Sequence, residues 1–472
     1  MQLEQVLTTS IDEFKQNMMD FCKNEDLKSL TPDTVCHFVS VLKGHLQKLG
    51  TTTIQSFFES HDTEQPYIEH NGNRYLNKYK GKKEIITVLG KVNVNRNVYQ
   101  HARGGKSLAP LDTKLGIDRE YIMPDVKEIV LFSCAHNTPE ETAQIIKKCS
   151  LFELHPTTIK RTVESAGAFI EEHKENIKDS VNQAVSKQEK TGDVAVCSLD
   201  GVNVLLNEAG KKKGRPMERP VKDSPATASA YKNAMCGSVS YYKTVEINGK
   251  PSTERESSRY IARMPEERYG TFKAEFEEQV RGIGRQSTLP KVKILITDAH
   301  KSIMGYLENN PLFDDFERLI DFFHAAEHLS LLSEAIFGKS CKKAREWYLK
   351  YASKLKYSKD GVTQLIRSAD YYTNKKKLSK ERLQEVQKQL NYFKRNGKYM
   401  DYYRFIENGW PIGSGVIEAA CKSVVKQRMC RSGQRWSRKG GQSILSLRAY
   451  VKSGEWDEFW NSYYQLNYKK CA

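Results

Sequence analysis

The sequence contains neither a C-x-x-C pair nor a long apolar run. Its ten cysteines are spread over 472 residues, a pattern that indicates neither a cysteine zinc ribbon nor a disulfide framework and that favours reduced thiols in a cytosol. No stretch approaches the roughly 18 consecutive apolar residues of a membrane span, and the polar start Met1-Gln-Leu-Glu is not typical of a signal peptide. We therefore expect a cytoplasmic protein without a membrane partner.

Acidic residues are outnumbered along the chain. There are 75 Lys and Arg against 58 Asp and Glu, which gives a formal net charge of +17. An excess of this size indicates a polyanionic partner, and nucleic acid is the first candidate. The length favours roughly two to four domains, because a single hydrophobic core rarely serves so many residues.

The N-terminal part divides into a helical region, residues 1–65, and a small β unit, residues 66–120. A Thr31-Pro32 start signal precedes a helical stripe that we expect to face a core, with a dimer seam as the alternative. In the β unit, Asn71-Gly72 predicts a hairpin turn and Gly90 the centre of a second strand pair. The helical stripe consists of Val35, Phe38, Val39, Leu42, Leu46 and Leu49.

Residues 121–185 return to a helical pattern. Thr138-Pro-Glu-Glu141 is a strong helix start, and after a short break His155-Pro-Thr-Thr158 opens a second helix over Ile159 to Ala166. Two short helices with a tight connection suit a helix-turn-helix, although a plain helical hairpin explains the same pattern. The candidate DNA-binding residues on the second helix are Thr157, Thr158, Lys160 and Arg161.

Residues 190–335 alternate strands and helices. Asp200 closes the apolar run that starts at Val194, and Asp298 closes the run that starts at Val292, both typical of central strands. Three strands in hairpin style are predicted at residues 194–199, 202–206 and 237–247, with a basic loop at residues 211–215. A helix from Glu266 and two further strands, at residues 292–297 and 318–323, complete the order of an RNase H-like sheet. The first and fourth strands of that sheet are neighbours, so we expect Asp200 and Asp298 to lie close together.

The C-terminal third is strongly basic. Between residues 339 and 405, within the helical block 336–408, there are 19 Lys or Arg against 6 Asp or Glu, interleaved with tyrosines, which suits a surface that follows phosphates. The last region, 409–472, places Glu418 in the first turn of a helix. From Ala419 to Gly454 it carries nine basic residues and no acidic one. The candidate DNA-binding residues there are Lys422, Lys426, Arg428, Arg431, Arg435 and Trp436.

Three carboxylates on a basic protein indicate metal-dependent chemistry on nucleic-acid phosphates. Asp200, Asp298 and Glu418 are the candidate catalytic and metal-binding residues. Lys422 and Lys426 follow Glu418 at helical spacing, so we expect both cations to lie beside the site, where the scissile phosphate would be.

Several motifs together resemble the DDE-type transposases of bacterial insertion sequences, in particular the ISKra group. The longest is Gly409-Trp-Pro-Ile-Gly-Ser-Gly-Val-Ile-Glu-Ala-Ala-Cys-Lys422, which is continued through Arg448. The others match in order, so that the resemblance covers roughly residues 85 to 450. They are Pro110-Leu-Asp-Thr-Lys-Leu-Gly116, Ser198-Leu-Asp-Gly201, Ile296-Thr-Asp-Ala-His300 and Ile320-Asp-Phe-Phe-His-Ala-Ala-Glu-His328.

The resemblance implies a mixed α and β multidomain fold, with an RNase H-like catalytic core that carries a helical insertion before Glu418. It implies two Mg²⁺ ions, with Mn²⁺ as a substitute, held by the three carboxylates for strand cleavage and strand transfer. Asp321-Phe-Phe-His324 matches a D-x-x-H element that supports the active site. The implied partners are the terminal inverted repeats of a mobile element and target DNA, bound by a homodimer or higher oligomer at the bacterial nucleoid.

Two features lead away from that family or to other functions. Relatives carry a cysteine pair where this chain has His101 and Gly104, so no zinc is expected. His324-Ala-Ala-Glu-His328 is also the H-x-x-E-H string of inverted zincins, which makes a zinc metallopeptidase one alternative. That string begins at a predicted strand end, whereas a zincin needs a continuous helix. A catalytically inactive DNA-binding protein derived from a transposase is the other alternative.

Overall fold

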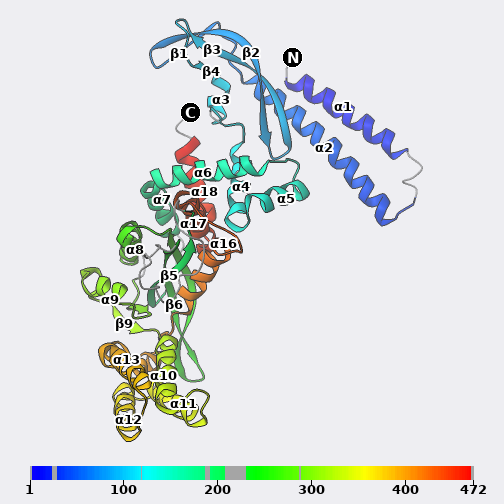
Figure 1. Cartoon of the computed structure of the whole chain (residues 1–472). Coiled ribbons are helices and arrows are strands. Elements are labelled where there is room, and N and C mark those ends of the chain that lie inside the picture. The colour runs from blue at the N-terminus through cyan, green and yellow to red at the C-terminus, as the bar shows by residue number, and fades with distance from the viewer. Residues whose placement is uncertain are drawn as a thin grey trace, which may run out of the picture. The chain divides into compact units, whose positions relative to one another are not determined.

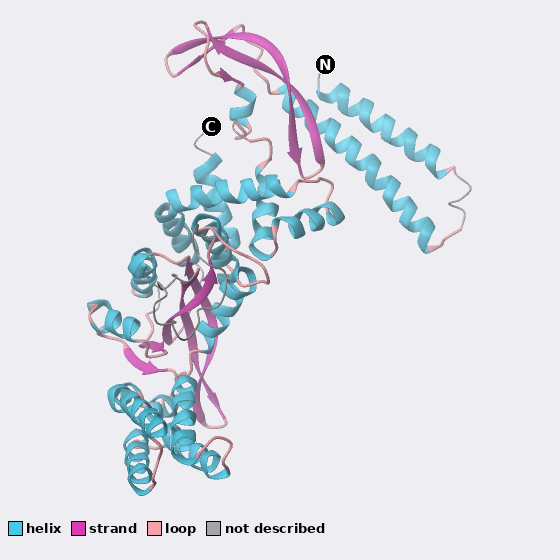
Figure 2. Cartoon of the chain, in the orientation of Figure 1, coloured by secondary structure: helices cyan, strands magenta, loops and turns pink. Residues whose placement is uncertain are grey.

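The chain forms two compact units (Figure 1, Figure 2). The structure is a computed structural model that describes residues 3–23, 29–118, 120–186, 192–207, 230–285 and 289–468. The first unit comprises Met1–Glu172 and Trp460–Ala472, and the second comprises His173–Phe459. Helices and strands are both abundant, which confirms the mixed α and β class.

The first unit opens with a helical hairpin of α1 (Leu3–Cys22) and α2 (Pro32–Ser60). As the sequence predicted, α2 begins at Pro32. The Thr31 side chain caps it by accepting the N–H of Thr34 at 3.2 Å, which satisfies one of the free donors at the start of the helix.

The apolar stripe of α2 is only partly covered. Phe38 packs near Phe21 of α1, with ring centroids 6.0 Å apart. Val35, Val39 and Leu46 stay exposed, Val39 to 54%. The expectation that the whole stripe faces a core of the chain is therefore wrong for these three residues, because α1 covers only one side of α2.

Four antiparallel strands in the order β1-β2-β3-β4 follow the hairpin. Asn71 and Gly72, both with positive φ, form the predicted turn between the first two strands. Gly90, with φ 124°, pairs with Thr87 across the second turn. The elements are β1 (Tyr67–His70), β2 (Asn73–Thr87), β3 (Gly90–His101), β4 (Ser107–Leu108) and α3 (Pro110–Lys114).

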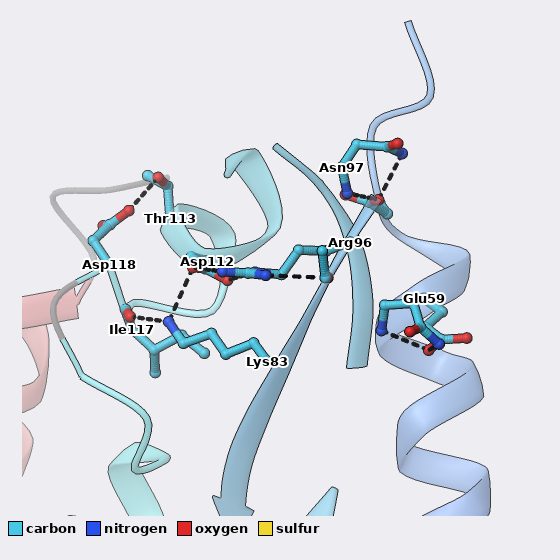
Figure 3. A network of polar contacts seen from close by, with 11 residues as sticks. Glu59, Lys83, Arg96, Asn97, Asp112, Thr113, Ile117 and Asp118 are labelled. Carbon is cyan, nitrogen blue, oxygen red and sulfur yellow. Dashed lines mark hydrogen bonds and ion pairs between the residues drawn. The ribbon is translucent and has the colours of Figure 1, made fainter. Parts of the chain in front are cut away.

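A network of polar contacts joins this sheet to α2 and α3 (Figure 3), and the Asp112 side chain at its centre is buried. The Asp112 carboxylate of α3 accepts hydrogen bonds from Lys83 Nζ at 2.9 Å and from Arg96 Nε at 2.7 Å. Glu59 at the end of α2 accepts the backbone N–H of Asn95 at 2.8 Å. The motif around residue 112 is thus explained by structure, since one carboxylate joins α3 to two strands.

Three helices, α4 (Pro124–His136), α5 (Pro139–Cys149) and α6 (Pro156–Glu172), pack on one another. The predicted helix start is confirmed, because Thr138 and Glu141 form a reciprocal capping box. The second helix is longer than predicted and runs on to Glu172. It extends because Ile159, Val163 and Ile170 are buried along one face of α6.

The second unit is built on a five-stranded sheet with the order β7-β6-β5-β8-β9. β5 pairs antiparallel with β6 and parallel with β8, and β8 pairs parallel with β9. The expected neighbours, the first and fourth strands of the unit, therefore lie side by side. The elements are α7 (Lys174–Ser186), β5 (Val194–Leu205), β6 (Tyr231–Ile247), β7 (Lys250–Arg263), η2 (Glu267–Tyr269), α8 (Gly270–Ile283), β8 (Val292–Thr297), α9 (Lys301–Glu308), η3 (Pro311–Phe313) and β9 (Glu317–Ile320).

Three strand boundaries differ from those that the sequence predicted. Asp200 does not end its strand, because β5 continues to Leu205, which pairs with Tyr231 at the start of β6. The third strand is β7, which follows the Asn248-Gly249 turn. β9 ends at Ile320, so Phe322 and Phe323 belong to the next helix. The basic loop predicted at residues 211–215 lies outside the described residues.

Helices cover both faces of the sheet. On one face, Cys197 and Leu199 of β5 pack with Phe272 and Phe276 of α8 and with Ile303 of α9. On the other face, alternate residues of β5 and β8 pack against the helix that follows β9. The alternation of a β-strand places Asp200 and Asp298 with this second set of residues.

The rest of the second unit is helical, apart from short turns. The elements are α10 (Phe322–Phe337), α11 (Lys342–Tyr357), α12 (Gly361–Lys375), α13 (Lys380–Asn396), η4 (Gly397–Tyr399), α14 (Tyr402–Glu407), α15 (Gly415–Ala420), η5 (Cys421–Lys426), α16 (Gln427–Met429) and α17 (Arg438–Ser453). The last helix, α18 (Trp456–Tyr468), begins in the second unit and belongs to the first unit from Trp460 on. The segment η5 is a π-helix. The predicted helical block between β9 and Glu418 is confirmed.

Candidate active site

Parallel pairing brings the two aspartates to the same level of the sheet. The register of β5 and β8 ends with Ser198 opposite Ile296. Asp200 lies two residues beyond Ser198, and Asp298 lies two residues beyond Ile296. Both border a cleft of about 250 Å³ at this edge. The sequence-predicted pair is therefore assembled, although 98 positions separate its members.

Asp200 is partly buried, and its surroundings shift the pKa of its carboxyl group. Burial raises the pKa of its carboxyl group, and the negative charge of Asp298 raises that pKa further. The Gly201 N–H, 2.6 Å from Oδ1, and the Cys421 thiol, 3.6 Å from Oδ2, oppose the rise, as does the charge of Lys426. A nearby cation would favour the ionised form of this group.

Glu418 reaches the same edge through its helix but does not join the aspartates. It is exposed on α15, and its Oε1 accepts a hydrogen bond from Ser414 Oγ at 3.2 Å. Cys421, three residues later, contacts Asp200, so the end of α15 packs at β5. Among the described residues, no three His, Cys, Asp or Glu side chains form a group able to hold a metal ion.

Asp321 connects the three segments that meet here. It is 1% exposed, and its own N–H donates to Thr297 O at the end of β8, at 2.8 Å. Its carboxylate caps α10 by accepting the His324 N–H at 2.8 Å, and it also accepts the N–H of Ser414. The sequence named Asp321 as a supporting residue, and the structure supplies the contacts: Asp321 holds Ser414, which in turn bonds Glu418.

The H-x-x-E-H string lies entirely within α10, which begins at Phe322. The predicted break in the helix is therefore wrong. His324 Nδ1 is 3.8 Å from Glu327, which is largely exposed. The His328 ring stacks on Tyr392 with centroids 3.6 Å apart, and its Nδ1 is 2.5 Å from Gln389 Oε1. Burial lowers the pKa of His328, and both the ring face and Nδ1 of this imidazole are in contact with neighbouring side chains.

Tyr392 is a residue that the sequence did not single out. It comes from α13, and its hydroxyl is buried with no hydrogen-bond partner among the described residues. Burial raises the pKa of this phenol, and the charges of Asp298 and Asp321 raise it further. The helical block thus contributes a side chain close to the aspartates. A tyrosine among several others in a basic helix carries no sequence signal that would mark it.

The basic segment after Glu418 is partly a surface and partly a core. Lys422, Lys426 and Arg435 are exposed, and Arg431 is half-buried. Residues 421–426 form a π-helical turn, and both Lys422 and Lys426 are exposed on it.

Arg428 and Trp436 are structural. Arg428 is 2% exposed, with its guanidinium 4.9 Å above the Trp436 ring. The Trp436 indole donates to Met429 O at 3.0 Å, and its backbone pairs with the end of β5. Their expected place on a DNA-facing surface is therefore corrected, because both side chains are engaged in contacts within the fold.

In the first unit, α6 presents the predicted residues at its start. Thr157, Lys160 and Arg161 are exposed. Thr158 is half-buried, and its hydroxyl is 3.0 Å from the Tyr121 hydroxyl. The four residues thus divide into three that are accessible and one that holds the helix in place.

The tyrosines of the basic helices differ in accessibility. Tyr357 and Tyr371 are exposed, Tyr357 to 63%. Tyr351 is buried against Trp347, and Tyr372 packs on Phe337. Of these four, only the exposed pair is open to stacking with a base.

No protein-family model and no curated protein matches the chain. None of the helices in the described part of the chain is long and apolar enough to cross a membrane. The function is therefore inferred from the residues at the sheet edge and from the distribution of charge.

Proposed function

We propose that the chain is a DDE-type DNA transposase that binds the ends of its mobile element and cuts and transfers DNA strands at the β5–β8 edge. The observation that carries this proposal is the parallel register, which sets Asp200 and Asp298 level at one edge of the sheet. The strand order, three antiparallel strands followed by two parallel ones, agrees with an RNase H-like core. The formal charge of +17 suits a DNA substrate.

The donor set at this edge fits Mg²⁺. Two carboxylates share one region, and burial together with mutual repulsion disfavours ionised Asp200, so a divalent cation would relieve an existing electrostatic cost. Carboxylate oxygens are the ligands that Mg²⁺ prefers. Asp200 and Asp298 would hold the metal ions. Glu418, which does not form a three-residue group with them in this structure, is the third ligand in this proposal. Bound there, Mg²⁺ would activate the attacking oxygen and stabilise the leaving oxygen of a phosphodiester.

The chain's own residues would position these groups. Asp321 holds the backbone of Ser414, and the Ser414 hydroxyl bonds the Glu418 carboxylate, so α15 is oriented from the core of the sheet. Lys422 and Lys426 are exposed just beyond Glu418, where their charges attract the phosphates on either side of the cut. They act by electrostatics and read little sequence.

Recognition of the element ends belongs to another part of the chain in this proposal. The packed helices α4, α5 and α6 would act as a helix-turn-helix module, with Lys160 and Arg161 meeting DNA. The exposed residues of the basic helices would contact flanking or target DNA. The active form would be a homodimer or higher oligomer on DNA, in the cytoplasm and at the nucleoid of a bacterium.

A cleavage assay tests the catalytic assignment. The substrate is duplex DNA carrying both ends of the segment that encodes the chain, with Mg²⁺ present. Asp200→Asn, Asp298→Asn and Glu418→Gln should each reduce cleavage to below detection, because the metal needs charged oxygens. DNA affinity should stay within about two-fold, because it comes from Lys and Arg.

Glu327→Gln is the matched control, since Glu327 is an exposed carboxylate of the same unit, and it should cut like the wild type. Full cleavage by any of the three variants would remove that residue from the site. DNA binding without cleavage by the wild-type chain would favour a catalytically inactive DNA-binding protein instead.

A zinc peptidase is the second candidate, and the position of the H-x-x-E-H string on one helix favours it. The neighbours of His328 oppose it, because that ring is stacked on Tyr392 and bonded to Gln389. Elemental analysis of the purified chain separates the two functions. A peptidase would hold about one Zn²⁺ per chain. The transposase should hold no stoichiometric zinc, and after a chelator has removed bound metal its activity should be restored by Mg²⁺ alone.

A further inference from the structure

The cleft lies beyond the end of β8, where Asp200 and Asp298 border it. Its other lining residues from β5 are Leu199, Gly201 and Asn203, so it opens from this strand edge toward the face of the sheet that α8 and α9 cover. Its polar wall is a cross-strand pair, Asn203 of β5 and Asn233 of β6, which face each other in the register and both border the cleft. Gly201 leaves room beside Asn233, because a Cβ at this position would lie only 3.3 Å from Asn233 Nδ2 and would crowd that side chain. Two carboxamides therefore offer both donors and acceptors into one space.

The opposite wall is aromatic and fixed. The Tyr306 ring has Lys273 Nζ 4.9 Å from its centroid, and its hydroxyl donates to Glu277 Oε1 at 2.9 Å. Tyr269 borders the same space from a left-handed backbone with φ 55°, directly after Arg268 with φ 52°. Two adjacent side-chain-bearing residues in this region are uncommon and tend to occur at ligand-binding sites.

The size and position of the cleft limit the kind of ligand that it can hold. At about 250 Å³ the cleft is smaller than the roughly 300 to 1,000 Å³ of pockets for drug-sized ligands, so it suits a single planar ring system. Asp200 and Asp298 border it, which places its occupant next to the scissile phosphate of the proposed reaction. Aromatic rings for stacking and amides for a base edge are the groups with which enzymes hold a base outside its duplex.

We propose that this cleft receives one nucleobase of the strand being cut, turned out of the duplex beside the scissile phosphate. The inference rests on the proposed function and names the substrate group that the site takes. The base would stack against Tyr306 or Tyr269 while its edge bonds the carboxamides of Asn203 and Asn233. The sugar and phosphate of the same nucleotide would remain at the carboxylates, so that the base would fix the position of the cut.

Photo-crosslinking tests this proposal without requiring cleavage. The full chain is bound to element-end duplexes in which one pair at a time near the end is replaced by an adenine·5-iodouracil pair, with Ca²⁺ in place of Mg²⁺. One position on the cut strand should crosslink to a peptide that contains Tyr269 or Tyr306. The double variant Asn203→Ala, Asn233→Ala should lower that yield about 10-fold or more.

Asn207→Ala is the matched control, because Asn207 is an exposed asparagine that follows the same strand and does not border the cleft, and it should crosslink like the wild type. Circular dichroism and total DNA affinity report whether the double variant folds. If it does not, the wild-type crosslink map decides the question by itself.

The two proposals fail in different ways. A chain that cuts the ends but crosslinks at neither tyrosine, or whose crosslink survives in the folded double variant, overturns the cleft assignment and leaves the transposase standing. A chain that gives the crosslink but cuts no strand keeps the cleft and removes the catalysis. A chain that binds no duplex removes both.

Discussion

Two carboxyl groups that are shielded from water serve opposite purposes in this chain. Asp112 is enclosed by Lys83 and Arg96, so its charge is already compensated and it fastens α3 to the sheet. Asp200 has another carboxylate, Asp298, as its strongest charged neighbour. A buried anion with cations around it stabilises a fold, whereas one beside a second anion is prepared to bind a cation.

Asp112→Ala should lower the free energy of unfolding of the first unit by about 3 to 5 kcal/mol, because it leaves two partly buried cations without their counter-charge. Urea unfolding measures the loss in unfolding free energy, and hydrogen exchange of the β2 and β3 amides provides a second measurement of it. Asp118→Ala is the control, because Asp118 is exposed and accepts a hydrogen bond from the hydroxyl of Thr113; it should cost less than about 1 kcal/mol. Equal losses would contradict the assigned role of Asp112.

Asp200→Asn should raise the melting temperature of the metal-free chain at neutral pH. The folded state raises the pKa of Asp200, so folding favours the protonated form, and the ionised form becomes destabilising as the pH rises from the ordinary pKa to the raised one. The gain should disappear at a pH below the ordinary pKa. Mg²⁺ should raise the melting temperature of the wild type but not of the variant. A wild type that ignores Mg²⁺ would contradict metal binding at this edge.

At the scale of elements, local sequence signals determine some helices and turns, whereas tertiary packing changes the geometry of others. The cap at Thr138 and the turn at Asn71-Gly72 are local, and both formed where the sequence placed them. The segment after Glu418 did not keep α-helical spacing, because a π-helical turn runs from Cys421 to Lys426 while Cys421, Val424 and Val425 are buried. Burial of that apolar set therefore outweighs ordinary helix geometry.

Helix α6 should recognise the base sequence of the element ends. Replacing Lys160 and Arg161 with Ala should weaken binding to the element ends more than to random DNA, by roughly 1 to 3 kcal/mol for each base that the variant no longer reads. Replacing Lys422 or Lys426 should weaken both about equally and reduce the dependence of affinity on salt. Fluorescence anisotropy over a salt series measures each constant. An equal loss on both DNAs for the α6 variant would disprove the helix-turn-helix assignment.

At the scale of the whole molecule, the chain leaves its first unit at Glu172 and returns to it at Trp460. The returning segment is aromatic: Tyr463 is 2% exposed and packs edge-on to Phe169, with centroids 5.1 Å apart. The first unit is therefore complete only when residues 460–468 are present with residues 1–172.

Tyr463→Ala should therefore destabilise the N-terminal unit by about 3 kcal/mol or more, the usual cost of deleting a buried aromatic ring. Its neighbour Tyr464 is 37% exposed, so Tyr464→Ala provides a control with the same chemistry and a smaller effect. Limited proteolysis with mass mapping should show new cuts within residues 1–172. Cuts confined to residues 173–459 would contradict the assignment of this segment to the first unit.

The sequence by itself determined what depends on neighbours along the chain. The helix starts at Pro32 and Pro139, the turn at residues 71 and 72, and the helical block before Glu418 follow from capping, positive φ and periodicity, all of which are local. The adjacency of Asp200 and Asp298 was also predictable, because the order of strands and helices limits the possible sheets.

Only the tertiary structure decided which side chains are accessible at the site. Arg428 and Trp436 look like a DNA-binding pair in the sequence but pack on each other within the fold, and Tyr392 looks ordinary but lies near the aspartates. Charge and aromatic character are properties of a residue, whereas burial depends on segments that are far apart in the chain. The cleft between Asn203, Asn233 and Tyr306 likewise exists only where two strands and two helices meet, which no local pattern records.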